Sequence, residues 1–109
     1  MADDPIIVNG SKFWYAGQKL HRIDGPAAEY ENGCKEWYQD GKLHRTDGPA
    51  VDYYFVDGYK AWYKHGKIHR TDGPAVENAD GTEDWFLDGK KLTKFQLNSK
   101  TFMAITKLI

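Results

Sequence analysis

Short segments in which apolar and polar residues alternate run along this chain, and residue pairs containing glycine interrupt them at intervals of about a dozen residues. The segments are rich in aromatic and β-branched residues and lack a helical period, so they predict β-strands joined by tight turns. Glycine tolerates the positive φ that a two-residue hairpin needs. The predicted turns are Asn9-Gly10, Gly17-Gln18, Asn32-Gly33, Asp40-Gly41, Asp57-Gly58, His65-Gly66, Asp80-Gly81 and Asp88-Gly89.

The turn positions also predict which residues face each other across the strands. If Asp40-Gly41 is the centre of a two-residue hairpin, Tyr38 lies opposite Leu43. The same geometry at other turns predicts two further cross-strand pairs, Ala28 with Trp37 and Val76 with Trp85. Each such pair contributes roughly 0.2 to 1 kcal/mol to a sheet.

A longer unit occurs three times in the chain. It begins with Trp-Tyr, continues with His-Arg-x-Asp-Gly-Pro-Ala seven residues after the tryptophan, and ends in Asn-Gly or Asp-Gly. The middle unit has two extra residues between Val51 and Gly58, and an insertion of two preserves the alternation of a strand. A fourth unit has Leu92 and Thr93 in place of His and Arg. The tryptophans are 23, 25 and 23 residues apart: Trp14, Trp37, Trp62 and Trp85.

These repeats predict an all-β fold, a twisted antiparallel meander sheet of about eight strands over residues 9–92. Proline cannot donate to a strand ladder, so Asp47-Gly48-Pro49 predicts a bend between two strand halves.

The tail predicts a different element. Thr93-x-x-Gln96 has the spacing of a helix capping box, and apolar residues with helical spacing follow at Phe95, Phe102, Ile105 and Ile109. We therefore expect one domain over residues 1–109, in which a C-terminal helix over 93–109 caps the edge of the sheet.

Composition excludes several classes of protein. The 109 residues include 15 Lys+Arg, 16 Asp+Glu and one cysteine, with a formal net charge of -1. This balance lacks the positive field that attracts nucleic acids or anionic membranes, so we expect neither as a partner. Cys34 alone cannot form an internal disulfide or a cysteine-rich zinc site. No signal peptide or long apolar run is recognisable, which predicts a soluble, cytoplasmic protein.

The aromatic strand, the turn ending in glycine and the His/Arg-then-Gly strand resemble MORN-type (membrane occupation and recognition nexus) repeats over about residues 9–92. The unit His44–Ala50 and its equivalents are more similar still to repeat proteins of bacteriophages, bacteria and giant viruses. The resemblance implies protein association or scaffolding and no catalysis. The Asp-Gly-Pro step differs from the Gly-rich spacing of MORN repeats, which disfavours lipid binding.

Histidine, arginine and aspartate in one motif are residue types that phosphoryl or acyl transfer uses. A catalytic site is one asymmetric constellation, whereas this motif recurs in register, so we interpret it as structural and expect no enzyme activity. Successive histidines stand roughly 10 Å apart by strand geometry, too far to share a zinc ion, and we expect no metal or cofactor. We expect the arginines to pair with the aspartates or to cap carbonyls at the bend, and the histidines to stack beside the tryptophans, which pack the core. The residues assigned to the repeat are Trp14, Trp37, Trp62, Trp85, His21, His44, His69, Arg22, Arg45 and Arg70.

Strand alternation predicts a second aromatic row on the face opposite the tryptophans. It includes Tyr15 and Phe86, and the two-residue insertion adds further tyrosines. A single sheet with aromatics on both faces leaves one face partly exposed, and contiguous exposed aromatics mark interfaces. Packing within the fold is the competing interpretation. The candidate protein-binding residues are Tyr38, Tyr53, Tyr54 and Tyr63.

These features favour a non-enzymatic module that binds another protein. The resemblance suggests a phage or bacterial accessory protein that inhibits or scaffolds a host protein, in the host cytoplasm if phage-encoded. The alternative is a nucleotide- or anion-binding sponge that uses aromatic and Lys/Arg positions, with a lysine row (Lys42, Lys67 and Lys90) along one sheet edge. We expect a monomer or a homodimer.

Overall fold

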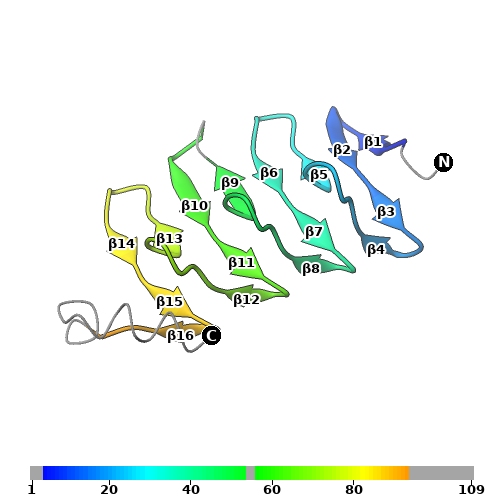
Figure 1. Ribbon diagram of the computed structural model, residues 1–109. Helices are drawn as coiled ribbons and strands as arrows, with labels where there is room; N and C mark the ends of the chain where they lie inside the picture. The colour runs from blue at the N-terminus through cyan, green and yellow to red at the C-terminus, as the bar shows by residue number, and fades with distance from the viewer. Residues whose placement is uncertain (1–3, 54–55, 94–109) are drawn as a thin grey trace.

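The strands of the computed structural model lie side by side in one twisted layer (Figure 1). The structure describes residues 4–53 and 56–93, and these residues form strands, turns and bends without a helix. Eight strands form an antiparallel sheet in chain order: β1 (Ile6–Val8), β2 (Ser11–Phe13), β5 (Ala28–Glu29), β6 (Lys35–Glu36), β9 (Val51–Tyr53), β10 (Tyr59–Ala61), β13 (Val76–Glu77) and β14 (Glu83–Asp84). The predicted all-β meander of about eight antiparallel strands is confirmed.

Four two-stranded hairpins continue this sheet. They are β3 (Tyr15–Ala16) with β4 (Lys19–Leu20), β7 (Tyr38–Gln39) with β8 (Lys42–Leu43), β11 (Tyr63–Lys64) with β12 (Lys67–Ile68), and β15 (Phe86–Leu87) with β16 (Lys90–Lys91).

β2, β6, β10 and β14 each run into the hairpin that follows (Figure 1), and the residue between the two strands is a tryptophan in all four cases. The Trp37 N–H donates to the Ala50 carbonyl at 2.7 Å, and the Trp37 carbonyl accepts the His44 N–H at 3.0 Å. Trp14 and Trp62 make the equivalent pairs of bonds. Backbone hydrogen bonding thus continues through the tryptophan, from the main sheet into the hairpin.

The turns at the hairpin tips have the geometry that their sequence predicts. At Asp40 and Gly41 both φ angles are positive, 52° and 77°, as a type I′ turn requires. Tyr38 lies opposite Leu43, so the predicted register of this hairpin is confirmed.

The turns at Asn32-Gly33 and Asp80-Gly81 differ, because they enclose three residues rather than two. Only the glycine has positive φ there, and the Asn32 Oδ1 accepts the N–H of Cys34, two residues on, at 3.0 Å. The extra residue moves the register by one place, so the two predicted pairs with tryptophan are wrong. The observed pairs are Ala28 with Glu36 and Val76 with Asp84.

The buried core is small and consists mainly of alanine and valine. Val51, Ala61 and Val76 form a cluster against which further residues pack: Leu43, Tyr53, Tyr59, Tyr63, Ile68 and Phe86. Trp14 is buried, whereas the other three tryptophans are partly buried. A single layer leaves much of its aromatic surface partly in contact with solvent.

Two predictions concern residues outside the described ranges. The C-terminal helix expected over 93–109 falls on residues 94–109 except for Thr93, and the candidate binding residue Tyr54 is also outside. Thr93 itself follows β16 and belongs to no strand or helix.

Candidate interaction surface

One face of the layer carries three equivalent arginine–tryptophan stacks. The guanidinium carbon lies 3.8, 3.8 and 3.9 Å from the indole centroid in the pairs Arg22–Trp14, Arg45–Trp37 and Arg70–Trp62. Arg45 Nε donates to Asp47 Oδ1 at 3.0 Å, and its Nη1 donates to the Pro49 carbonyl at 3.0 Å. Both predicted contacts of the arginines, with an aspartate and with a carbonyl, therefore occur. A Cβ on Gly48 would lie 2.8 Å from Arg45 Cζ, so a side chain there would displace the guanidinium from its present position.

The histidines make a contact that differs from the predicted stacking beside tryptophan. His44 Nδ1 accepts the backbone N–H of His65, the first residue of the next hairpin turn, at 3.0 Å. The equivalent bonds join His21 to Asp40 and His69 to Asp88, both at 2.9 Å. An Nδ1 that accepts a hydrogen bond is unprotonated. Each imidazole thus links one repeat to the next in its neutral form.

The surroundings of His44 and His69 favour this neutral form. Burial, followed by the charges of His65 and Lys64, lowers the pKa of His44 below its ordinary value. Burial is also the main cause that lowers the pKa of His69. The rings of His44 and His65 are stacked with their centroids 4.3 Å apart, which is why the charge of His65 acts on His44.

The residues of the predicted lysine row, Lys42, Lys67 and Lys90, follow the hairpin turns and are all exposed. Two of them pack on a glycine of the next hairpin. A Cβ on Gly66 would lie 3.5 Å from the side chain of Lys42, and a Cβ on Gly89 would lie 4.0 Å from Lys67 Cβ. The apolar stems of Lys42 and Lys67 therefore cover these glycines while the charged ends reach solvent.

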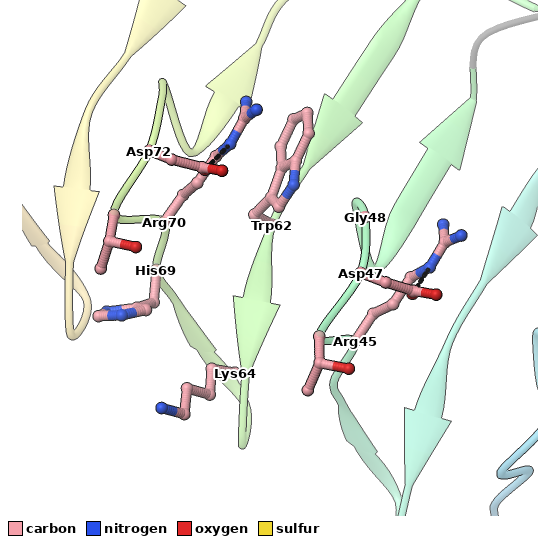
Figure 2. A pocket seen from close by; sticks show the side chains of 10 residues that line it. Arg45, Asp47, Gly48, Trp62, Lys64, His69, Arg70 and Asp72 are labelled. Carbon is pink, nitrogen blue, oxygen red and sulfur yellow. Dashed lines mark hydrogen bonds and ion pairs between the residues drawn. The ribbon is translucent and has the colours of Figure 1, made fainter.

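Grooves separate successive bends on the arginine–tryptophan face. The larger groove, of about 590 Å³, lies between residues 45–48 and 69–72, with Trp62 and Lys64 in its wall (Figure 2). An equivalent groove of about 380 Å³ lies between residues 23–25 and 44–47. Figure 2 shows the arginines beside the larger groove, each paired with its own aspartate. Their charges are thus partly balanced within the chain.

The opposite face carries an apolar row from the four hairpins, which we call the tyrosine face: Tyr15, Leu20, Tyr38, Leu43, Tyr63, Ile68 and Phe86. None of these residues is buried, and Tyr15 is 38% exposed. Because the described strands form one layer, no second sheet among them covers this row (Figure 1). Of the predicted binding residues, Tyr38 and Tyr63 belong to the row, and Tyr53 lies on the adjoining main sheet.

Three tyrosine hydroxyls converge on Glu36, which is only 9% exposed. The hydroxyls of Tyr30 and Tyr38 donate to Oε1 at 2.9 and 3.2 Å, and the hydroxyl of Tyr53 donates to Oε2. Neither Glu36 nor Tyr30 is among the site residues predicted from the sequence. The sequence offered one signal for this site. Glu36 is an acidic residue directly before Trp37, whereas the equivalent residues of the first and third units are Phe13 and Ala61.

The tyrosines around Glu36 are held as hydrogen-bond donors. Burial, together with the charge of Glu36 and the hydrogen bond to it, raises the pKa of Tyr38 to about 12. The pKa values of Tyr30 and Tyr53 are raised well above their ordinary value by the same causes. Two of the predicted binding tyrosines therefore direct their hydroxyls to a carboxylate of the chain itself.

No protein family, no curated protein and no solved structure was found to match this chain. Within residues 4–53 and 56–93 there is no helix long and apolar enough to span a membrane. The same residues contain no group of three or more side chains suited to hold a metal ion.

Proposed function

We propose that this chain is a non-enzymatic module that binds another protein through its tyrosine face. The observation that supports this function is a continuous row of partly exposed aromatic and aliphatic residues across four hairpins. Contiguous apolar surface on a protein marks an interaction site. Tyrosine suits such a site because it provides a large, rigid contact area at a low cost in conformational entropy.

The repeat architecture supports the same function. Equivalent positions at each step of a repeat form an extended surface suited to a macromolecular partner. The resemblance to MORN-type repeats favours protein association. The resemblance to repeat proteins of phages, bacteria and giant viruses favours an accessory protein that acts in the host cytoplasm by inhibiting or scaffolding a host protein.

Partner capture from the source cell, repeated with matched variants, tests this function. Tyr15→Ser and Tyr63→Ser should each weaken capture of the same protein by about thirtyfold, the effect of losing a hot spot of about 2 kcal/mol. Lys64→Ser is the control, because Lys64 is exposed, adjacent in sequence and lines the groove on the other face. Retained capture by both tyrosine variants, with loss in Lys64→Ser, would refute the tyrosine face as the binding surface.

The larger groove favours a second candidate, the binding of a nucleotide or another anion. Its volume of about 590 Å³ falls within the range of small-molecule sites, and Trp62 and exposed Lys64 line it. The pairing of Arg45 and Arg70 with aspartates weakens this candidate. Titration with ATP, followed by tryptophan fluorescence in the parent and in Lys64→Glu, separates the two candidates, because only an anion site responds.

A further inference from the structure

We propose that Glu36 and its three tyrosines form a cation site on the tyrosine face, which takes an arginine or lysine side chain of the partner protein. This inference rests on the proposed function, because it names the chemistry that the partner must present. The surface around Glu36 would then differ from the equivalent places in the other repeats.

The first observation is a carboxylate that is largely buried without a balancing cation. Within the described ranges, no lysine, arginine or histidine forms an ion pair with Glu36. Its three hydrogen-bond donors are neutral phenols. Burial of a charge is costly unless an opposite charge accompanies it. A guanidinium or ammonium group of a partner would therefore gain more binding free energy here than at a solvated carboxylate.

The fourth repeat provides the second, independent observation. Asp84 precedes Trp85 as Glu36 precedes Trp37, so the two acids occupy equivalent positions. Asp84 Oδ1 lies 3.2 Å from the Nζ of Lys91, which stands opposite Phe86 on the hairpin.

The second repeat has no such internal cation. The position equivalent to Lys91 is Leu43, opposite Tyr38. The architecture of the chain thus accommodates a cation next to an acid at this place, and supplies one only in the fourth repeat. At Glu36 a partner would supply it.

The surroundings of Glu36 match a cationic side chain with apolar neighbours. Tyr30, Tyr38 and Tyr53 point their hydroxyls at the carboxylate, so three aromatic side chains meet there, and a tyrosine ring can bind a cation through its face. Arginine fits best, because its guanidinium is planar and weakly hydrated and can stack on a ring. Leu43 and Ile68 on the same face would pack against apolar residues beside that arginine.

The test uses the intact protein and two small probes of the same shape. N-acetyl-arginine amide is the cation, and N-acetyl-citrulline amide is its neutral counterpart. In NMR titrations of the parent, arginine should produce saturable shifts centred on Glu36, Tyr38 and Tyr53, at an affinity at least tenfold above that of citrulline. Equal shifts with both probes, or shifts spread over all surface acids, would overturn the proposal.

Two variants separate the cation site from the fold. Glu36→Gln removes the charge, keeps one carbonyl oxygen as an acceptor for the tyrosines, and should abolish the preference for arginine. Leu43→Lys reproduces the arrangement of the fourth repeat, so its own ammonium should occupy the site and weaken arginine binding at least tenfold. Undiminished arginine binding in Leu43→Lys would refute the site even if Glu36→Gln fails to fold.

The same variants distinguish the two proposals. If Tyr15→Ser and Tyr63→Ser lose the captured partner while Glu36→Gln and Leu43→Lys retain it, the tyrosine face is functional and the cation site is wrong. If arginine binds at Glu36 but capture survives every tyrosine-face variant, the cation site stands and the proposed protein-binding function fails.

Discussion

Replacement of Arg45 is the sharpest test of how the repeat is held together. Arg45→Ala removes a stack on Trp37, a hydrogen bond to the Pro49 carbonyl and an ion pair with Asp47. The stack contributes about 0.5 to 2 kcal/mol, and the charged hydrogen bond about 1.5 to 3 kcal/mol. The ion pair adds at most about 1 kcal/mol, because Asp47 is 84% exposed. The expected loss is about 2 to 6 kcal/mol.

Thermal and urea unfolding measure this loss directly. A loss of 2 kcal/mol lowers the Tm of a domain of this size by about 8 to 16 °C. Arg45→Lys keeps the charge without the planar fork, and should recover less than half of the lost stability. Lys64→Ala is the matched control, because this exposed lysine borders the same groove, and it should change stability by no more than about 0.5 kcal/mol.

A double-mutant cycle with Trp37→Ala isolates the stack. The coupling free energy between Arg45 and Trp37 should be about 0.5 to 2 kcal/mol. Partner binding, measured on the folded fraction of Arg45→Ala, should persist, since the arginine belongs to the repeat and not to the tyrosine face. A Tm of Arg45→Ala equal to that of Lys64→Ala, or zero coupling with Trp37, would refute a structural role for the stack.

Acidification should destabilise the protein, because the unfolded chain protonates His44 near its ordinary pKa of about 6.5 while burial keeps the folded pKa lower. Urea midpoints should therefore be constant above that pH and fall below it, and His44→Asn, which retains an acceptor, should flatten the fall; a flat parent profile would contradict the histidine links. Gly48→Ala should cost about 1 to 3 kcal/mol in urea unfolding, because its Cβ would overlap the arginine guanidinium; a neutral result would mean that the bend relaxes freely. Tyr53→Phe removes a donor from a buried carboxylate and should cost about 1 to 3 kcal/mol by the same measurement. Tyr59→Phe is its control, and equal stability of the two variants would count against the carboxylate cluster.

Local sequence was sufficient to predict the strands and the turns at the hairpin tips. The Asp40-Gly41 pair permits a type I′ turn because both of its residues tolerate positive φ, and the two-residue turn sets the register of the hairpin around it. The three-residue turn at Asn32-Gly33 contains a similar pair, a small polar residue followed by glycine. Its register could not be predicted, because the side-chain hydrogen bond to Cys34 decides the loop length.

The contacts between repeats could not be predicted in the same way. His44 and its donor His65 are 21 positions apart, and Glu36 lies 17 positions from Tyr53. A motif indicates which residue types recur, but it does not indicate which neighbour each one meets when the repeats stack side by side.

The sequence by itself determined the repeat, the antiparallel meander and the residues available for both faces, because these follow from period, alternation and turn chemistry within one unit. Only the tertiary structure decided that arginine rather than histidine covers the tryptophans, and that Tyr38 and Tyr53 turn their hydroxyls to Glu36. The physical reason is that side-chain partners are selected by lateral packing across neighbouring strands. There the reach of a long side chain and the cost of a buried charge outweigh sequence proximity.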